Sequence, residues 1–235
     1  MSAVLPSVAD KPRYVEAMFG RIAPRYDLMN TLMTGGQDGN WRRIVAESVS
    51  LDSSGQASVL DVGTGTGKLA EAVRRAQPSA RVIGVDFTLP MLRQAQHDLL
   101  FAGADALKLP FADSQFDAVV SGFVMRNLAD VPAGIAEQAR VLRPGGQLVV
   151  METTPGPPNL LRPLFRLYFR RLVPLLGQLI AGDESAYTYL PESTLAFLEP
   201  DRLAAVLRKN GLIDVRVRRL AFGSVAVTSA RKPPA

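Results

Sequence analysis

Short apolar runs of strand length alternate with segments of helical periodicity along most of the chain. The apolar runs are residues 59–62, 81–86, 101–105, 116–122 and 147–151. Apolar positions recur at helical spacing over residues 69–76, 91–100, 131–142 and 201–210. Strands that are separated by helices lie parallel in a sheet covered on both faces, and such strands are largely apolar. The pattern therefore predicts an α/β fold.

The end of the chain carries two further strand patterns, over residues 212–220 and 222–230, with a turn near residues 221–223. A connection this short joins antiparallel strands. Upstream, the helix over residues 131–142 is expected to end at the Arg-Pro-Gly-Gly turn of residues 143–146. Together the patterns predict a mostly parallel seven-stranded sheet with an antiparallel strand at its C-terminal edge and helices on both faces.

Two segments fall outside this alternation. Residues 13–49 precede the first strand, and residues 153–199 interrupt the last stretch. Ligands of an open parallel sheet bind beyond the carboxyl ends of its strands, and additions at these two points of the chain can both reach that edge. We therefore predict one domain over residues 1–235, with an N-terminal helical lid and a second, inserted lid.

A glycine-rich loop follows the first predicted strand. Gly63, Gly65 and Gly67 alternate after the apolar run, and helical periodicity begins directly behind them. This strand–turn–helix arrangement lets the backbone approach a nucleotide-like ligand closely. Nineteen residues after Gly67 the second strand ends at Asp86, where a carboxylate can accept both hydroxyls of a ribose. The two features predict a ligand that contains adenosine.

The spacing of the glycines favours S-adenosylmethionine over a dinucleotide. Counted from Gly63, the third position of the dinucleotide fingerprint is Lys68, and counted from Gly65 it is Ala70, inside the helix. Asp61 stands just before the first glycine, where an acid suits a cationic ammonium better than phosphates. S-adenosylmethionine has that ammonium and no phosphate. A nicotinamide or flavin enzyme and a purely structural turn are the alternatives.

Composition limits the class of protein. The chain has 235 residues, 47% of them hydrophobic, and no cysteine, so it can form one sizeable core and cannot form disulfides or thiolate metal sites. Residues 1–12 contain no long apolar run, and no signal peptide is predicted. No stretch of about 18 apolar residues is present to span a membrane. We expect a soluble, cytoplasmic protein.

The net charge of +5 raises the question of a nucleic-acid partner. The basic residues are scattered and form no stripe interleaved with aromatic residues, so no nucleic-acid partner is predicted. The single histidine, His97, falls in the predicted helix over residues 91–100, where we expect a solvated surface side chain. With one histidine and no cysteine, no metal site is predicted.

The inserted segment contains a predicted helix, residues 159–173, with arginines on one stripe. Arg162, Arg166 and Arg170 stand four residues apart, and apolar and aromatic residues fill most other positions. Such a helix can lie in a membrane interface with its arginines toward anionic head groups. The side chains that would then lean toward lipid or an apolar substrate are Leu161, Leu164, Phe165, Phe169 and Leu172. An ordinary surface helix with solvated arginines is the alternative.

Four sequence motifs occur together in this chain. They lie in residues 18–30 and on to 41–43, in the glycine-rich loop, from residue 116 to residues 125–127, and in residues 181–193. With them the chain resembles, over nearly its whole length, the C-methyltransferases of quinone biosynthesis that act on demethylmenaquinone and the related ubiquinone precursor. The resemblance implies a Rossmann-like class I methyltransferase fold, with S-adenosylmethionine as cofactor and S-adenosylhomocysteine as product.

The resemblance also implies cofactor contacts at Thr66 in the loop, at Asp86 for the ribose, and at Asp105 and Ala106 for the adenine. The family's serine at the end of the fourth strand aligns with Gly122, so that contact is expected from the backbone alone. The full predicted cofactor-binding set is Asp61, Gly63, Thr64, Gly65, Thr66, Gly67, Asp86, Phe87, Asp105, Ala106 and Gly122.

The reaction implied by the resemblance is methylation of a ring carbon on a reduced, polyprenylated quinone precursor. That carbon is a weak nucleophile until the neighbouring phenol loses its proton, so the site must stabilise a phenolate. Arg126 is the predicted stabiliser, and because arginine stays protonated it cannot itself be the base. Tyr187 and Tyr189 are predicted to contact the ring hydroxyls, with packing in the lid as the alternative.

Demethylmenaquinol is the expected acceptor, with the ubiquinone precursor beside it. Two alternatives stay open: another small apolar or phenolic acceptor, and a non-catalytic S-adenosylmethionine-binding subunit of a quinone-synthesis complex. A binding subunit would keep Asp86 and the loop but lose the polar groups near the methyl, so Arg126 and the two tyrosines favour an enzyme. We also expect peripheral contact with the inner face of the membrane, and leave oligomer formation open.

Overall fold

One sheet of seven strands lies at the centre of the computed structural model, which describes residues 5–51, 56–95, 98–156, 160, 162–178 and 183–235. The strands are β1 (Ser58–Val62), β2 (Arg81–Asp86), β3 (Leu100–Gly103), β4 (Phe116–Gly122), β5 (Leu142–Thr153), β6 (Ile213–Leu220) and β7 (Val225–Arg231).

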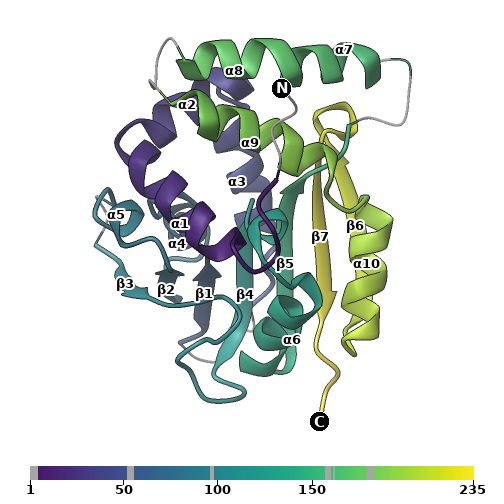
Figure 1. Ribbon diagram of the computed structural model, residues 1–235. Coiled ribbons are helices and arrows are strands. Elements are labelled where there is room, and N and C mark those ends of the chain that lie inside the picture. Colours follow the sequence, from purple (N-terminus) through teal and green to yellow (C-terminus); the bar gives the residue numbers. More distant parts are fainter. Residues whose placement is uncertain (1–4, 52–55, 96–97, 157–159, 161, 179–182) are drawn as a thin grey trace.

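The strand order is β3-β2-β1-β4-β5-β7-β6 (Figure 1). The strands from β3 to β5 pair in parallel, and β7 pairs antiparallel with both β5 and β6. The predicted mostly parallel sheet with an antiparallel C-terminal strand is confirmed. β6 occupies the edge itself, because the tight connection after it folds β7 back between β5 and β6.

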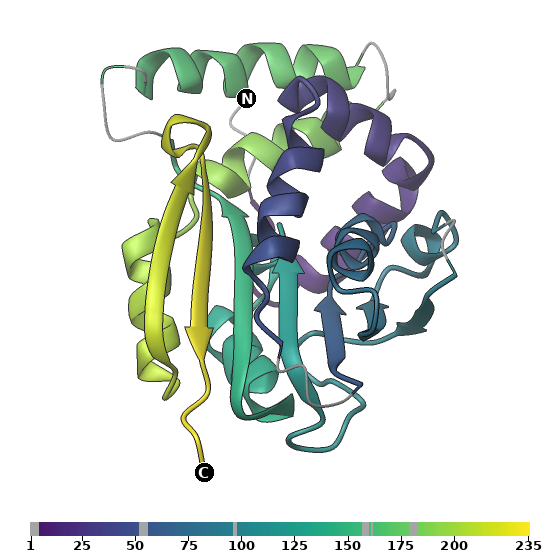
Figure 2. The same ribbon diagram turned by 180° about the vertical axis from the view of Figure 1, so that it is seen from behind.

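Helices cover both faces of the sheet. They are α1 (Lys11–Ile22), η1 (Ala23–Arg25), α2 (Tyr26–Thr34), α3 (Gln37–Ser48), α4 (Lys68–Ala76), α5 (Leu89–Leu92), η2 (Met125–Asn127), α6 (Val131–Val141), α7 (Arg162–Leu167), η3 (Tyr168–Leu172), α8 (Val173–Leu176), α9 (Glu184–Leu195), α10 (Pro200–Lys209) and η5 (Ala221–Gly223). α6 and α10 lie on the face seen in Figure 1, and α3 and α4 lie on the face seen in Figure 2.

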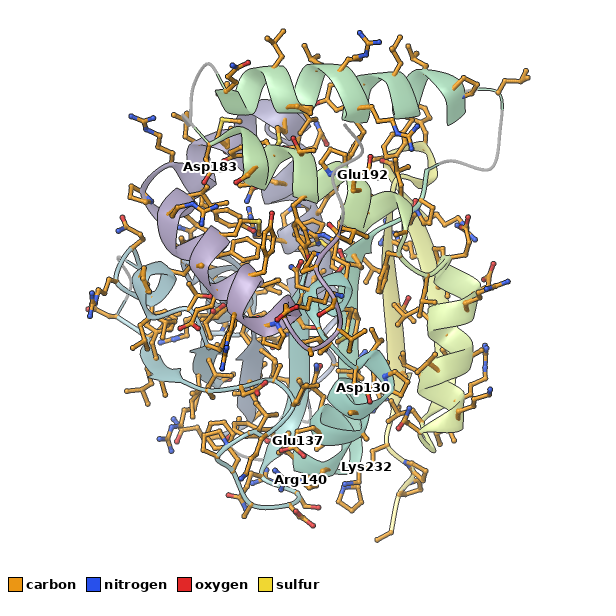
Figure 3. All side chains as sticks on the ribbon, viewed as in Figure 1. Asp130, Glu137, Arg140, Asp183, Glu192 and Lys232 are labelled. Carbon is orange, nitrogen blue, oxygen red and sulfur yellow. The ribbon has the colours of Figure 1, made fainter. Side chains whose placement is uncertain are left out.

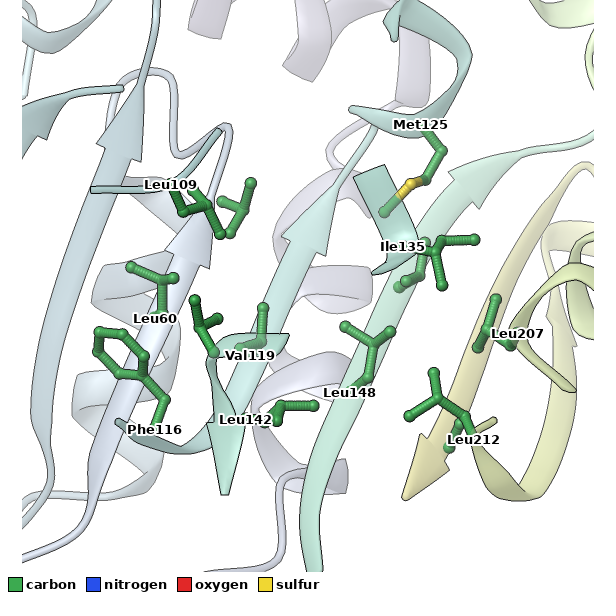
Figure 4. Close-up of a cluster of buried hydrophobic side chains, with 14 of the residues drawn as sticks. Leu60, Leu109, Phe116, Val119, Met125, Ile135, Leu142, Leu148, Leu207 and Leu212 are labelled. Carbon is green, nitrogen blue, oxygen red and sulfur yellow. The ribbon is translucent and has the colours of Figure 1, made fainter. Parts of the chain in front are cut away.

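The core on the α6–α10 side joins strands and helices through fully buried aliphatic side chains. Leu60, Val119 and Leu148 lie on neighbouring strands and pack with Ile135 of α6 and Leu207 of α10 (Figure 4). Burying a side chain of this kind stabilises the fold by roughly 1.5–3 kcal/mol. The cluster thus fixes the strands whose carboxyl ends carry the site.

The prediction of a helix over residues 91–100 was wrong. α5 ends at Leu92, and the N–H groups of Gln94 and Ala95 bond only three residues back, as in a tight turn. Met91 is buried but Leu89 is half exposed, so this segment has too little apolar contact to stabilise a longer helix. His97, predicted to lie on the surface of that helix, falls outside the described residues.

The predicted turn at residues 143–146 is present within the bounds of β5. Phe116 of β4 pairs with Leu142 and Ala118 pairs with Gln147, so the intervening residues bulge out of the ladder. Gly145 has a φ of +78°, a left-handed conformation that glycine adopts without strain. The bulge ends α6 and directs the chain into the buried part of β5.

The two segments outside the alternation lie over the carboxyl ends of the parallel strands. α1, α2 and α3 precede β1, while α7, η3, α8 and α9 follow β5, and both views place these helices at the same end of the molecule (Figures 1 and 2). Arg21 donates to Asp183 Oδ2 at 2.8 Å, which ties α1 to the N-terminus of α9. Among the described residues, each helix is too short or too polar to cross a bilayer.

Candidate active site

The glycine-rich loop adopts the predicted strand–turn–helix geometry between β1 and α4. Gly63 and Gly65 have φ values of +68° and +57°, and a Cβ atom built on Gly63 would lie 2.3 Å from Val124 Cγ2. The N–H groups of Gly63 and Thr64 both donate to the carbonyl of Val85 on β2. A side chain at Gly63 would therefore be strained and would clash with the residues that follow β4.

Asp86 stands at the carboxyl end of β2, as predicted, and holds the glycine loop. Its Oδ2 accepts the N–H of Gly65 at 2.8 Å, and its Oδ1 accepts the N–H of Thr88 at 2.8 Å. Burial raises the pKa of Asp86 above its usual value, against the effect of these hydrogen bonds. A carboxylate oxygen accepts more than one hydrogen bond, so Asp86 retains capacity for ligand hydroxyls.

Asp61 lies fully buried beneath the loop. Its Oδ2 accepts the hydroxyl of Thr64 at 2.7 Å, whereas its Oδ1 has no partner among the described residues. Burial raises the pKa of Asp61 to about 7, and the neighbouring carboxylate of Asp86 adds to that increase. A ligand with positive charge above the loop would favour the ionised form of both acids.

A small cavity of about 120 Å³ lies above the loop. The members of the predicted cofactor set that line it are Gly63, Gly65, Asp86, Phe87, Asp105, Ala106 and Gly122. Asp61, Thr64, Thr66 and Gly67 are not among the lining residues, and the hydroxyl of Thr66 donates to Asp27 Oδ1 at 2.8 Å. These four residues support the loop and its contact with α2 rather than forming the cavity wall.

A second, larger cavity of about 650 Å³ adjoins the first. Its lining comes from α1, α2 and α3, from α7, η3 and α9, and from the connection between β6 and β7, and most of it is apolar or aromatic. Phe19, Tyr26, Phe123 and Asn127 line both cavities. The two cavities therefore meet where β4 ends, next to Arg126.

Arg126 lines the larger cavity, and a buried carboxylate holds it in place. Its Nη1 lies 2.5 Å from Glu152 Oε1 and 2.8 Å from the carbonyl of Phe123, and its backbone N–H donates to Glu152 Oε2 at 3.2 Å. Only 5% of the Arg126 side chain and 3% of the Glu152 side chain are exposed. The sequence prediction named Arg126 as the stabiliser of a phenolate and gave it no partner, so it missed Glu152, which stands near the end of β5.

The two predicted tyrosines also line the larger cavity. Tyr189 donates its hydroxyl to Asn127 Oδ1 at 3.2 Å, and burial raises its pKa to about 12. The hydroxyl of Tyr187 is buried without a partner among the described residues, and burial raises its pKa further above the usual value. Both hydroxyls therefore stay protonated near neutral pH and keep their capacity to donate a hydrogen bond.

Asp38 is a further acid on the wall of the larger cavity that the sequence prediction did not include. Arg42 Nη1 lies 2.5 Å from its Oδ2, and the hydroxyl of Thr34 donates to its Oδ1 at 3.2 Å. The pair stands one helical turn apart on α3, the spacing of side chains that meet on a helix. That spacing is visible in the sequence and could have indicated the pair.

The inserted helix is present as α7, η3 and α8, with a π-helical turn at Tyr168–Leu172. Arg170 is 59% exposed, and its Nε lies 3.7 Å from Glu192 of α9, which is labelled in Figure 3. The side chains of Arg162 and Arg166, and the whole of Leu161, lie outside the described residues. Phe165 and Phe169 point toward the cavity that they line, and their rings lie 4.5 Å apart.

Solved structures share this fold at low sequence identity. The [4+2]-cyclase SpnF aligns with a TM-score of 0.70 and 19% identity, covering 99% of this chain and 98% of its own. A SAM-dependent methyltransferase from Thermotoga maritima aligns with a TM-score of 0.66 and 16% identity, covering 92% of this chain and 98% of its own. Because one of the two is a cyclase, the likeness establishes the fold and leaves the reaction open.

Relatives of higher identity extend over most of the chain. A demethylmenaquinone methyltransferase from Deinococcus radiodurans is 45% identical over 221 residues, covering 91% of this chain and 90% of its own. The ubiquinone/menaquinone biosynthesis C-methyltransferase UbiE of Desulfotalea psychrophila is 44% identical over 225 residues, covering 94% and 91%. A demethylmenaquinone methyltransferase from Thermus thermophilus is 43% identical over 223 residues, covering 92% and 100%.

The strand order, the glycine loop and these relatives together define a class I S-adenosylmethionine-dependent methyltransferase. Within that class the chain belongs to the ubiE/COQ5 methyltransferase family, whose model matches residues 7–232. The resemblance predicted from the four sequence motifs is thereby confirmed, and the nicotinamide, flavin and purely structural interpretations of the loop are not supported.

Proposed function

We propose that this enzyme transfers the methyl group of S-adenosylmethionine to a ring carbon of a reduced, polyprenylated demethylquinone, with demethylmenaquinol as the preferred acceptor. The observation that carries the proposal is the pair of adjoining cavities. The smaller has carboxylates and a glycine loop for a cationic adenosyl ligand, and the larger has apolar walls for a prenylated ring. The names of the relatives from Deinococcus radiodurans and Thermus thermophilus support the choice of acceptor.

The residues of the smaller cavity fit S-adenosylmethionine. Asp86 suits the ribose hydroxyls, Asp105 can accept from the adenine amino group, and the glycine loop provides close backbone approach. Asp61 lies buried beneath the loop, and its carboxylate, when ionised, favours a cationic ligand over a phosphate. When bound, the cofactor supplies an electrophilic methyl on a sulfonium.

Arg126 is the proposed partner of the developing phenolate. It stands at the junction of the two cavities, and its Nε–H has no partner among the described residues, so the guanidinium has an unused donor. Glu152 holds the other side of the group through Nη1, which orients the planar fork. An oriented charge near the acceptor oxygen stabilises the phenolate without reorganisation during the reaction.

Tyr187 and Tyr189 are proposed to donate hydrogen bonds to oxygens of the ring. Tyr189 must release Asn127 Oδ1 to do so, because a phenol has a single donor. Burial keeps both hydroxyls protonated, and the hydroxyl of Tyr187 has no other partner among the described residues. Donors that hold the ring keep the acceptor carbon within about 3 to 3.5 Å of the methyl, the separation that efficient transfer requires.

The helices of residues 13–49 and 153–199 are proposed to act as lids on a single domain. The smaller cavity, about 120 Å³, is well below the roughly 300 Å³ of common ligand sites. Val15 and Phe19 of α1 are on its wall, so an outward movement of α1 would enlarge the cavity for the cofactor. Closure afterwards would exclude water from the transfer.

Peripheral contact with a membrane is proposed for the outer surface of α7, η3 and α8. Leu167 and Leu172 are 59% and 43% exposed on this surface, and Arg170 and Arg171 are exposed beside them. Leu164, which also lines the larger cavity, is 64% exposed. Each such arginine contributes about 1 kcal/mol near an anionic leaflet, less at high salt. A long polyprenyl chain is insoluble in water, so an enzyme that methylates it must collect it from lipid.

The proposal is tested by incubating the purified enzyme with methyl-labelled S-adenosylmethionine and a panel of acceptors. The panel contains demethylmenaquinone, the demethylated ubiquinone precursor and an unrelated phenol, each quinone in its reduced and oxidised form. We expect label in the reduced naphthoquinol and none in the oxidised quinone, because only the reduced ring has a phenol to ionise.

Label transfer to the unrelated phenol in preference to every quinol would assign the enzyme to a different acceptor. Tight cofactor binding without transfer to any acceptor would indicate a binding subunit. Equal transfer to oxidised and reduced quinones would contradict the role given to the phenolate and to Arg126.

A further inference from the structure

The connection between β6 and β7 places an aromatic side chain in solvent. Phe222 of η5 is 84% exposed, and its backbone has φ 57° and ψ 18°, in the left-handed region. Ala221 before it has a φ of 47°. Both the exposed ring and the left-handed backbone of two consecutive non-glycine residues destabilise the folded state, and neither is explained by packing in the core.

The same residues belong to the wall of the larger cavity. Ala221 and Phe222 line it opposite Leu164, Phe165 and Phe169 of the inserted helix. Figures 1 and 2 both show the connection between β6 and β7, in yellow, directly beneath α7. We call the space between η5 and the α7–η3 helix the rim of the cavity.

One side of the rim is firmly packed and the other is not. The ring of Phe165 lies against Gly156, where a Cβ atom would come within 2.8 Å of Phe165 Cδ1, and it also contacts the ring of Phe169. Phe222 takes part in no ring pair among the described residues and is largely in solvent. An apolar chain can therefore pass the rim if Phe222 moves, while Phe165 stays in place.

The side chains that line the cavity change from polar at its inner end to apolar at the rim. Arg126 and Asn127 stand where the larger cavity meets the smaller one, and the rim contributes leucine and phenylalanine side chains. The volume of about 650 Å³ lies within the roughly 300–1,000 Å³ of sites that enclose whole organic ligands. Such a cavity suits a molecule with a polar ring at one end and a hydrocarbon chain at the other.

We propose that the rim is the binding subsite and exit for the polyprenyl tail, and that Phe222 contacts the tail where it leaves the cavity. The inference rests on the proposed function, since it assumes a prenylated quinol in the larger cavity. Beyond the rim the tail meets the exposed leucines of α7 and η3, including Leu167, which continue the apolar path outside the protein.

The test compares two reduced demethylnaphthoquinones, one with a single isoprene unit and one with a long polyisoprene chain, both in neutral detergent micelles. The measured quantity is the ratio of kcat/KM for the long-tailed quinol to kcat/KM for the short-tailed one. For Phe222→Ser we expect this ratio to fall about tenfold, the effect of losing one apolar contact at a substrate chain. Leu100→Ser, which replaces a half-exposed leucine on β3 at the opposite edge of the sheet, should leave the ratio unchanged.

Phe222→Gly separates tail binding from a structural role. Glycine adopts the left-handed backbone without strain, so this variant should unfold at a higher urea concentration than the wild type. Its long-to-short ratio should nevertheless fall as in Phe222→Ser. A residue that only stabilised the turn would not lower the ratio while the stability rose.

An unchanged ratio in both Phe222 variants would overturn the inference, and the tail would then leave elsewhere. The same fractional loss on both quinols would also overturn it, because Phe222 would then act on the ring or the fold. Failure of the proposed function looks different: the wild-type enzyme would methylate neither quinol, whatever the length of the tail.

Discussion

The buried pair of Arg126 and Glu152 gives the sharpest prediction about stability. Glu152→Gln keeps the shape of the side chain and removes the negative charge. Its one remaining oxygen can accept only one of two backbone N–H groups, that of Arg126 (bound at Oε2) or that of Thr153 (bound at Oε1). Arg126→Met keeps much of the volume and removes the positive charge. Each single variant leaves the other ion buried without its partner.

The size of the effect follows from the burial of both groups. With side-chain exposures of 5% and 3%, neither ion can recover its hydration when its partner is lost. Removing one member of such a pair costs about 3–5 kcal/mol of the free energy of unfolding. The double variant of Arg126→Met and Glu152→Gln leaves no unpaired charge, so its cost should be well below the sum of the two single costs, by about 3 kcal/mol.

The measurement is urea unfolding of the wild type, the two single variants and the double variant. The matched control is the same cycle on Arg43 and Glu47 of α3, whose side chains are 61% and 52% exposed. Exposed pairs of this kind couple by about 0.3–0.5 kcal/mol. The contrast between the two cycles isolates the contribution of burial.

Additive costs in the Arg126–Glu152 cycle would refute this reasoning, since they would mean that the two side chains do not interact in solution.

A second variant of Arg126 tests its role in the reaction. Arg126→Lys retains the charge but not the planar fork, so it should lose turnover by more than it loses cofactor affinity. Normal turnover with weakened cofactor binding would instead make Arg126 a cofactor-binding residue.

Three further variants test the cofactor side of the site. Asp86→Ala removes the carboxylate that is proposed to accept two ribose hydroxyls, and calorimetry should show that the binding free energy of S-adenosylmethionine is weaker by about 2–4 kcal/mol; an unchanged Kd would remove Asp86 from the site. Gly63→Val adds a Cβ that would lie 2.3 Å from Val124 Cγ2, so it should abolish cofactor binding, and an active variant would contradict the loop geometry. Because burial raises the pKa of Asp61 to about 7 in the folded protein, the folded state holds a proton that the unfolded chain has released, and stability falls as pH rises. Between about pH 4 and pH 7 the wild type should therefore lose up to about 4 kcal/mol of unfolding free energy relative to Asp61→Asn, and a constant difference would contradict the raised pKa.

The glycine loop and Asp86 could be predicted from the sequence because their geometry is local. Short stretches of sequence are enough to predict a strand, a turn that needs positive φ, and an acid at the end of the next strand. The parallel sheet followed in the same way from the alternation of apolar runs and helical patterns. In the structure, each of these elements adopts the conformation that its local sequence favours, and packing does not change it.

Glu152 could not be placed in the same way. It meets Arg126 across neighbouring strands, 26 residues away in the sequence, and only the register of β4 on β5 brings the two together. An acid at the end of an otherwise apolar strand was the one indication available. Asp38 is different, because its pairing with Arg42 lies within a single helix and could have been recognised from spacing.

The shortened α5 and the exposed Phe222 show the limits of periodicity. Helical spacing over residues 91–100 indicates which side chains share a face. The length of the helix depends on how many of those side chains pack against the rest of the protein. Only Met91 of α5 is buried. For Phe222, the predicted turn near residues 221–223 is confirmed, whereas the strand predicted to begin at residue 222 begins only at Val225.

Carbon methylation of the quinol ring is tested most directly by locating the transferred methyl in the product. The reaction is run with ¹³C-methyl S-adenosylmethionine and reduced demethylmenaquinone, and the product is examined by NMR for coupling of the new methyl to the ring carbons. The predicted result is a methyl bonded to the unsubstituted ring carbon beside the prenylated one. A methyl bonded to a ring oxygen, or no methylated quinol at all, would contradict the function derived for this enzyme.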